Sequence, residues 1–381
     1  MRIDYTEDQQ LLLQMVREFA KSEIAPGVRE RERGSIFPEE ILRRMGELGL
    51  LGMIVPEEYG GAGTDTVTYC LAIEEIARVC PSSAVTMSVN NSVCCYPILA
   101  YGSEEQRKRY LPRLATGETL GAFCLTEPHC GSDATAIRTR AVRDGDSYVL
   151  NGTKAWVTNG GAASVYIVAA VTDPAQAGRG ISAFIVESSF PGFRIGTIED
   201  KMGLRASRTT EVILEDCRVP AENLLSVEGM GIRIALSALD GARIGVAAQA
   251  VGIAQGAFDA ALQYSKQRTA FGKTLAEIEA VRNMFADMYA QIQAARMLTH
   301  RAAALRDKAV PFSKESSMAK LYASEMCNRV TGTCVQIHGA YGFSREFAAE
   351  RYYRDARVTT IYEGTSEIQR VVIARNLLKG A

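Results

Sequence analysis

The sequence has little of what metal-dependent and disulfide-bonded proteins need. Among 381 residues there are three widely separated histidines, and the nine cysteines form no CxxC pair. Histidines this far apart do not give the ligand spacing of a zinc site, so we expect no metal centre. An odd number of scattered cysteines in apolar surroundings, such as Cys70 and Cys124, is typical of reduced, buried thiols in an intracellular protein.

Motifs of several nucleotide-dependent and hydrolytic enzymes are also missing. The chain contains no GxGxxG string, no GxxxxGK[ST] loop and no GxSxG elbow. A nucleotide cofactor would therefore have to be held by another arrangement. The formal net charge of -1 creates no field that attracts nucleic acid or an anionic membrane, so neither is expected as a partner.

Long apolar runs are absent as well. We find no stretch apolar enough to span a bilayer, and no basic start followed by an apolar signal core. Thr6 and Gln9 form a capping box, so a helix is expected to begin almost at once. These features predict a soluble, cytoplasmic protein without membrane insertion, and a processed mitochondrial matrix form is the alternative.

What is present divides the chain into three parts. Residues 1–118 show helical spacing of apolar residues, for example Leu12 and Val16. Residues 119–228 carry short runs rich in Val, Ile, Thr and Tyr between turn signals, which predicts a barrel-like antiparallel β domain. Residues 229–381 are helical again, and many Ala and Gly residues indicate close helix packing there. The sequence thus predicts an α+β protein of three domains.

Two segments of the predicted β domain carry residues suited to ligand binding, and each has a structural alternative. The loop 126–133 offers Gly131 and Ser132 for close approach to a phosphate, or it is a turn with a Ser-Asp cap. Trp156 and Thr158 point to one face of a strand and suit a flat heterocycle. A single tryptophan in a β domain is, however, more often a core residue.

A third segment, residues 354–367, lies before the last predicted helix. Glu363 follows an apolar pair, and Gly364 allows unusual backbone geometry. Thr365 and Ser366 could offer hydroxyl and amide groups to a pyrophosphate at the helix start. The alternative is that Glu363 only caps or neutralises that helix.

Together these segments resemble the acyl-CoA dehydrogenase family, and the resemblance covers essentially the whole chain. The motifs that carry it are Leu125–Pro128 with Gly131–Asp133, Trp156–Gly161, Lys266–Arg268 with Phe271–Gly272, Gln336–Gly342 and Ile361–Thr365. The resemblance implies an N-terminal helical domain, a middle β domain and a C-terminal four-helix-bundle domain. It also implies a homotetramer that binds FAD between subunits.

The resemblance further implies which residues bind. Those lining the flavin would be Phe123, Leu125, Thr126, Gly131, Ser132, Trp156, Val157 and Thr158. A neighbouring subunit would hold the adenosine diphosphate part with Arg268, Phe271, Glu279, Gln336, Ile337, Gly339 and Ala340, and Thr365, Ser366 and Glu367 would complete the FAD site. Residues touching the acyl-CoA would be Ser132, Asp240, Gly241, Ala242, Arg243 and Gly364.

Two positions depart from the family pattern. Residue 279 is Glu where many relatives have Gln, which puts that single FAD contact in doubt. In one branch of the family the catalytic base lies beside the helix arginine, at the place of Ala242. Because alanine cannot take a proton, the base in this chain is expected to be Glu363.

The activity implied by the resemblance is FAD-dependent α,β-dehydrogenation of an acyl-CoA, with an electron-transferring flavoprotein as the electron acceptor. Residues 82–86 are uncharged, which disfavours a dicarboxylate substrate because glutaryl-type enzymes place an arginine near there. A short straight-chain acyl-CoA is expected. The alternatives are a short branched-chain (2-methyl) substrate, an acyl-CoA oxidase, or a non-catalytic acyl-CoA-binding module.

Overall fold

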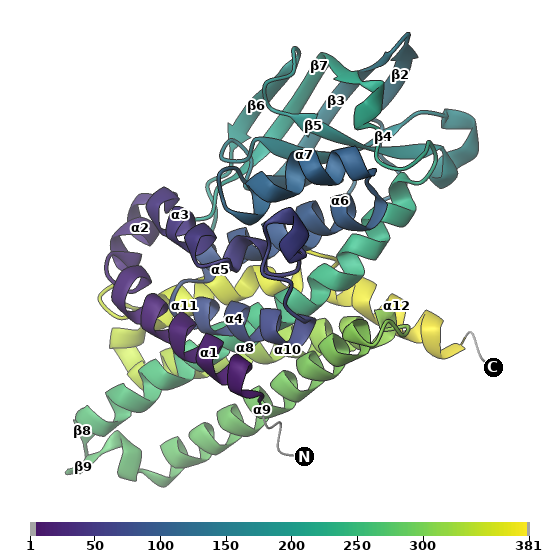
Figure 1. Cartoon of the computed structure of the whole chain (residues 1–381). Coiled ribbons are helices and arrows are strands. Elements are labelled where there is room, and N and C mark those ends of the chain that lie inside the picture. Colours follow the sequence, from purple (N-terminus) through teal and green to yellow (C-terminus); the bar gives the residue numbers. More distant parts are fainter. Residues whose placement is uncertain (1–4, 379–381) are drawn as a thin grey trace.

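The predicted order of helices, sheet and helices is confirmed in the computed structural model, which describes residues 5–378 (Figure 1). The N-terminal helices are α1 (Glu7–Phe19), α2 (Val28–Gly34), α3 (Glu39–Glu47), α4 (Thr66–Val79), α5 (Pro81–Val89), α6 (Tyr96–Tyr101) and α7 (Glu104–Ala115). The capping box predicted from Thr6 and Gln9 is present at the start of α1. All nine cysteines are unpaired and eight are buried, as the sequence predicted.

The middle part is a sheet that α7 covers on one side (Figure 1). Its strands are β1 (Gly121–Cys124), β2 (Arg140–Asp144), β3 (Ser147–Thr158), β4 (Val165–Val171), β5 (Ile181–Glu187), β6 (Phe193–Ile198) and β7 (Thr209–Pro220). The order is β1-β4-β2-β3-β7-β6, with β5 also paired to β4. The prediction of a purely antiparallel sheet is wrong, because β1 and β2 both run parallel to β4. The long loop between β1 and β2 permits this pairing, which no local sequence signal reports.

Trp156 is not a core residue, contrary to the structural alternative weighed from the sequence. The pairing of β3 with β7 shifts register between Lys154 and Val157, which is a β-bulge. Trp156 lies in this bulge with a φ of 59° and is 61% exposed. Bulges redirect side chains, and this one turns the indole out of the core.

The C-terminal part consists of α8 (Gly231–Gln267), α9 (Glu279–Asp307), α10 (Ser313–His338), α11 (Ala349–Arg357) and α12 (Ser366–Leu378), with a small hairpin of β8 (Thr269–Ala270) and β9 (Lys273–Thr274). The predicted close helix packing is confirmed where α8 crosses α4. A Cβ on Gly252 would lie 2.3 Å from the Glu74 carbonyl oxygen, and one on Gly256 would lie 2.3 Å from that of Arg78.

The prediction that no apolar stretch is long enough to span a bilayer is wrong for one helix. The helix α8 is long and apolar enough to do so, with a mean hydropathy of 1.3 over its most apolar window. In the structure 78% of that window is buried. Most of this window is therefore covered by the rest of the protein.

Two buried carboxyl groups join the three parts of the chain. Glu32 of α2 accepts hydrogen bonds from the backbone N–H groups of Arg205 and Ala206, at 3.2 and 3.3 Å. Asp355 of α11 accepts one from the backbone N–H of Leu204 at 2.7 Å. Burial and the negative charge of Glu32 raise the pKa of Asp355.

This junction predicts a pH-dependent stability. Because the pKa of Asp355 is higher in the folded than in the unfolded chain, the folded chain binds more protons between the two values. Its contribution to stability should be complete below the unfolded pKa of about 4. It should decline as pH rises through the folded pKa, by about 1.4 kcal/mol for each pH unit that separates the two pKa values. Asp355→Asn should remove this slope. Urea unfolding of both forms between about pH 4 and 8 checks it, and parallel curves would contradict it.

Candidate active site

Glu363 lies in a short loop between α11 and α12, and we call residues 362–365 the Glu363 loop. Its φ is 56° and that of Gly364 is 93°. A left-handed backbone is costly for a residue with a Cβ. It persists where the surroundings enforce it, which happens most often at functional sites.

Side chains from three helices hold the two central carbonyls of this loop. Nε of Arg243 (α8) donates to the Glu363 carbonyl at 3.3 Å, and Nζ of Lys320 (α10) donates to the Gly364 carbonyl at 2.6 Å. The amide of Gln369 (α12) donates to both, at 3.2 and 2.9 Å. Within residues 5–378 the backbone N–H of Glu363 donates no hydrogen bond, so it can bind a ligand oxygen.

The carboxyl group of Glu363 lies in a dry environment. The side chain is half-buried, but its Oε2 atom is fully buried and has no hydrogen-bond partner in the described part of the chain. Burial raises the pKa of Glu363 to about 7, and the positive charges of Arg243 and Lys320 only partly oppose this. A carboxylate with this pKa is a stronger base than an exposed one.

The helix-capping alternative for Glu363 does not account for this geometry. The first turn of α12 is capped by Thr365, whose Oγ1 accepts a hydrogen bond from the backbone N–H of Ile368 at 3.3 Å. The Glu363 side chain is therefore not needed as a cap. It is available for chemistry.

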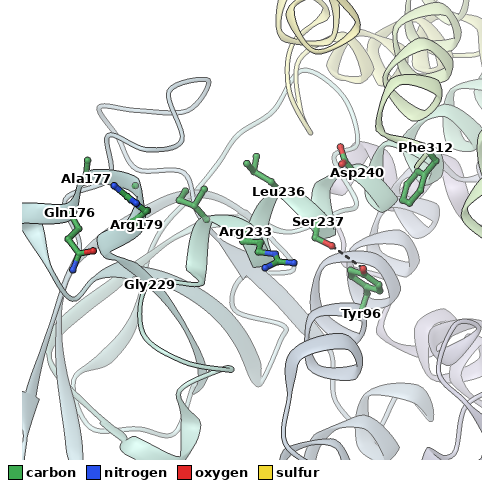
Figure 2. Close-up of a pocket in the computed structure, with 12 residues that line it drawn as sticks. Tyr96, Gln176, Ala177, Arg179, Gly229, Arg233, Leu236, Ser237, Asp240 and Phe312 are labelled. Atoms are coloured by element: carbon green, nitrogen blue, oxygen red, sulfur yellow. Dashed lines mark hydrogen bonds between the residues drawn. The ribbon is translucent and has the colours of Figure 1, made fainter. Parts of the chain in front are cut away.

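A cleft of about 800 Å³ runs along the first part of α8 (Figure 2). Its lining residues are Tyr96, Gln176, Ala177, Gly178, Arg179, Gly229, Ile232, Arg233, Leu236, Ser237, Asp240 and Phe312. At the inner end Asp240 accepts hydrogen bonds from Nη1 of Arg243 at 2.5 Å and from Ser313 at 3.0 Å. Because Arg243 also holds the Glu363 carbonyl, the cleft ends beside the Glu363 loop.

Asp240 was expected from the sequence, whereas Arg233 and Ser237 were not recognised as lining residues. Both lie on the same face of α8 as Asp240, seven and three residues before it. Helical periodicity extended backward from Asp240 would have found them. Arg179 comes from a distant segment, and nothing in the sequence places it there.

The predicted residues of the middle part gather at one edge of the sheet. Phe123 and Leu125 lie at the end of β1 and contact the apolar core, whereas Gly131 and Ser132 are exposed in the following loop. That loop is fixed from β3, where the backbone N–H of Ala155 donates to the Thr126 carbonyl at 2.9 Å. The exposed Trp156 thus lies close to the loop in the fold.

A buried ion pair fixes the same loop, and no pattern in the sequence indicated it. Nζ of Lys154, which is 0% exposed, lies 2.7 Å from Oε1 of Glu127. Glu127 also accepts the backbone N–H groups of Arg138 and Thr139, at 2.7 and 2.9 Å. The charge of Lys154, together with these hydrogen bonds, lowers the pKa of Glu127 although burial by itself would raise it.

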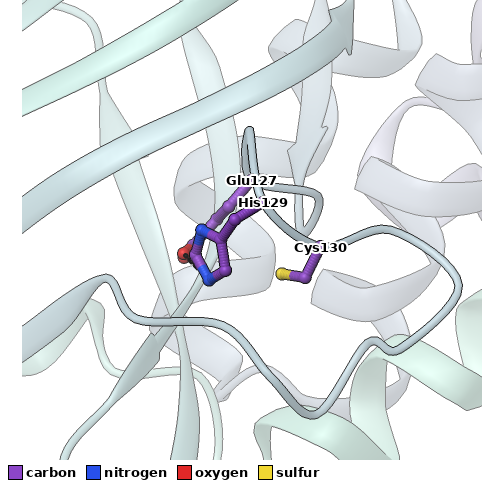
Figure 3. Close-up of side chains that lie close together, drawn as sticks. All are labelled: Glu127, His129 and Cys130. Carbon is purple, nitrogen blue, oxygen red and sulfur yellow. Dashed lines mark ion pairs between the residues drawn. The ribbon is translucent and has the colours of Figure 1, made fainter.

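His129 and Cys130 lie beside Glu127, so three potential metal ligands come together here (Figure 3). Their spacing along the chain is not that of a known metal motif, and the proximity arises from the turn between residues 127 and 130. Because the Glu127 carboxylate is already neutralised by Lys154, the cluster lacks the negative charge that would favour a cation.

The residues predicted to hold the adenosine diphosphate part of FAD lie far from Glu363, whereas Thr365, Ser366 and Glu367 follow it closely in the chain. Arg268, Phe271 and Glu279 are exposed around the β8–β9 hairpin, and Phe271 is 96% exposed. The guanidinium of Arg268 lies 5.7 Å from the ring centre of Tyr341, which places the segment 336–341 near it. From Arg243 to the end of α8 the helix is roughly 36 Å long, so the β8–β9 hairpin at the end of α8 lies far from the Glu363 loop.

Three family models match the chain in order. They describe the N-terminal, middle and C-terminal domains of acyl-CoA dehydrogenases, and they match residues 6–118, 122–217 and 229–378. The fold and the site therefore place this chain in the acyl-CoA dehydrogenase family, whose members are FAD-dependent oxidoreductases, and the protein is an enzyme of that family.

Individual members of the family are similar to this chain over nearly its whole length. The mouse short-chain specific acyl-CoA dehydrogenase, a mitochondrial protein, is 50% identical over 99% of this chain and 92% of its own length. Butyryl-CoA dehydrogenase from Megasphaera elsdenii superposes with a TM-score of 0.97 at 44% identity, over 99% of this chain and 100% of that one. A chain from a structure described as electron transferring flavoprotein of Acidaminococcus fermentans gives 0.98 at 49% identity, with both chains fully covered.

The residues present fit a flavin. The bulge presents the Trp156 indole outside the core, and a planar ring stacks well against a flat heterocycle. At the start of α12, the Ser366 hydroxyl and the Gln369 Oε1 atom are buried without hydrogen-bond partners in the described residues. Such atoms are costly unless a ligand pairs with them.

Proposed function

We propose that this enzyme removes two hydrogens from the α and β carbons of a short-chain acyl-CoA, giving the trans-2-enoyl-CoA, and passes the electrons to an electron-transferring flavoprotein. The observation that carries the proposal is the buried, unpartnered Oε2 atom of Glu363. A basic carboxylate, a free backbone N–H and an adjoining cleft together meet the needs of proton abstraction next to a carbonyl.

In the mechanism, Glu363 takes the α-proton. Its backbone N–H donates to the thioester oxygen and stabilises the negative charge that develops there as the proton leaves. Arg243 and Gln369 hold the loop carbonyls, which keeps this N–H and the carboxylate in a fixed relation. FAD, when bound, accepts the hydride that leaves the β-carbon.

For FAD we propose the residues that the family resemblance implies. The flavin contacts come from Phe123, Leu125, Thr126, Gly131, Ser132, Trp156, Val157 and Thr158, and Thr365, Ser366 and Glu367 complete the proposed FAD site. The length of α8 supports the assignment of Arg268, Phe271, Glu279, Gln336, Ile337, Gly339 and Ala340 to the FAD of a neighbouring subunit. The proposed assembly is the homotetramer that the family resemblance implies.

The cleft along α8 is the proposed path of the CoA arm. Ser132, Asp240, Gly241, Ala242, Arg243 and Gly364 are the proposed contacts of its thioester end. At the outer end the cleft is lined by Arg179 and Arg233. Guanidinium groups bind phosphates well, so these two residues are suited to the phosphates of CoA.

The preference for a short acyl chain is supported by the wall beside Glu363. Tyr362 packs in an apolar cluster with Val85, Val89 and Ala242. Its hydroxyl donates to Oε1 of Gln249 at 2.5 Å, and Nε2 of Gln249 donates to the carbonyl of Pro81 at 3.0 Å. Because these hydrogen bonds tie the wall to α5 and α8, it cannot easily retreat to admit a longer chain.

Anaerobic flavin reduction tests the proposal. We expect the purified protein to be yellow and to lose colour with butyryl-CoA at least about tenfold faster than with octanoyl-CoA, because unaccommodated methylenes are excluded by the wall. Glutaryl-CoA should react poorly. A faster reaction with 2-methylbutyryl-CoA would replace the straight-chain assignment by the branched-chain one.

Two further outcomes separate the other classes of protein. Stoichiometric peroxide during aerobic turnover, without any acceptor protein, would identify an acyl-CoA oxidase. A colourless preparation that stays apo after addition of FAD would identify a binding module. A cytoplasmic location is part of the proposal, because the nine unpaired cysteines suit a reducing compartment.

A further inference from the structure

Lys320 is the most deeply buried positive charge near the proposed base. It lies on α10 and is 0% exposed, and its ammonium group donates to the carbonyl of Gly364 at 2.6 Å. Burying a lysine is expensive unless its charge is used.

The charged groups around Lys320 come from three other elements and from its own helix. Glu363 and Glu367 attract it from the Glu363 loop and α12, Glu325 attracts it from α10, and Arg243 repels it from α8. Burial lowers the pKa of Lys320 to about 7 in spite of these carboxylates. Near neutral pH the ammonium group is therefore only partly protonated, and its degree of protonation depends on the nearby negative charge of Glu363.

We propose that Lys320 is a positioning residue for the reaction: its ammonium group fixes the Gly364 carbonyl, holds the Glu363 loop in its left-handed conformation, and keeps the neighbouring carboxylate ionisable in a dry cleft. This inference rests on the proposed function, in which Glu363 is the base. No sequence pattern gave Lys320 a role, because a lysine in an amphipathic helix is ordinarily exposed.

The geometry explains how one ammonium group can hold the Glu363 loop and also favour ionisation of the Glu363 carboxyl group. The two left-handed residues, Glu363 and Gly364, turn their carbonyls toward α8, α10 and α12, where each is held by a side-chain donor. The contact to Lys320 is the shortest of the four. A positive charge held against the backbone of this loop also favours the ionised form of the Glu363 side chain.

Two variants separate charge from hydrogen bonding. Lys320→Met keeps an unbranched side chain, one atom shorter, but removes both the charge and the donor. Lys320→Gln removes the charge but retains a donor. Lys308→Met, at an exposed position after α9, is the control for loss of one surface charge. All are studied as FAD-loaded protein, and thermal unfolding establishes which variants fold.

The protonation of Glu363 is read directly from the infrared band of its protonated carboxyl group, identified by subtraction of Glu363→Gln. In both Lys320 variants the midpoint of this band should move upward by about one pH unit or more. The rate of flavin reduction by butyryl-CoA at its high-pH plateau should fall roughly tenfold to a hundredfold in Lys320→Met, because misplacement of a catalytic group slows the reaction. Lys320→Gln should recover part of that loss.

Unchanged midpoints in whichever Lys320 variant folds would overturn the inference. A shift equal to that of Lys308→Met would overturn it too. Failure of the proposed function is a separate result: wild-type protein that never bleaches with any acyl-CoA would refute the dehydrogenase assignment, while the infrared titration would still report on Lys320 and Glu363.

Discussion

Glu363→Gln is expected to lower the rate of flavin reduction by butyryl-CoA about a thousandfold or more, because glutamine cannot accept the α-proton. The loop should keep its conformation, since its carbonyls are held through the backbone and the side chain of Glu363 takes no part. FAD content should therefore stay near that of the wild type. Stopped-flow measurement of flavin bleaching, at matched FAD occupancy, gives the comparison.

The pH dependence of the wild type supplies a second readout of the same residue. Glu363 must be ionised to act as a base, so the reduction rate should rise with pH and level off above the pKa of about 7. The exposed carboxylate of Glu118, which pairs with Arg113 on the surface, provides the control: Glu118→Gln should match the wild type. A Glu363→Gln enzyme that bleaches at a near-normal rate would remove this residue as the base.

Lys154→Met should destabilise the fold by about 3–5 kcal/mol, because it leaves the Glu127 carboxylate buried without its counter-charge. The Glu127 side chain is only 3% exposed. Its remaining hydrogen-bond donors are backbone N–H groups, which do not neutralise it, and the ring of His129 is farther away at 3.8 Å. Urea unfolding measures the loss, and weaker FAD retention should accompany it because this pair anchors the loop 126–133.

Two control variants test the explanation given for Lys154→Met. The double variant Lys154→Met, Glu127→Gln removes both charges and should recover much of the stability. Arg113→Met, which breaks an exposed pair, should cost less than about 1 kcal/mol. In Lys154→Met the penalty should shrink as pH falls and Glu127 becomes protonated. A loss of under about 1 kcal/mol at neutral pH would mean that the buried pair contributes no more than a surface one.

The order of the parts was predictable because it depends on local patterns. Apolar residues at helical spacing indicated the N- and C-terminal helices, and the Thr6 capping box indicated the first helix start. The sheet was predicted in kind but not in topology. Which strand lies beside β4 is decided by contacts distant in sequence, so the parallel pairing with β1 could not be predicted.

In the candidate site, too, local motifs were predictable and contacts between distant segments were not. Glu363 and Asp240 were found because their local motifs resemble those of a family, and the helical spacing around Asp240 already contained Arg233 and Ser237. For Trp156 the motif alone favoured a core position, whereas the family resemblance placed it on the flavin. Its exposure contradicts the core position, which the sequence could not exclude because the bulge is set by the register of β3 against β7.

The three-part architecture, the family and the proposal of Glu363 as the base all came from the sequence, because each is carried by periodicity or by a contiguous motif. The buried charges and their partners became apparent only in the folded chain. They are Lys154 on Glu127, Lys320 on the Gly364 carbonyl, and Glu363, whose pKa is raised by its dry surroundings. Burial and pairing arise from elements that meet only when the chain folds, and a pKa follows from both.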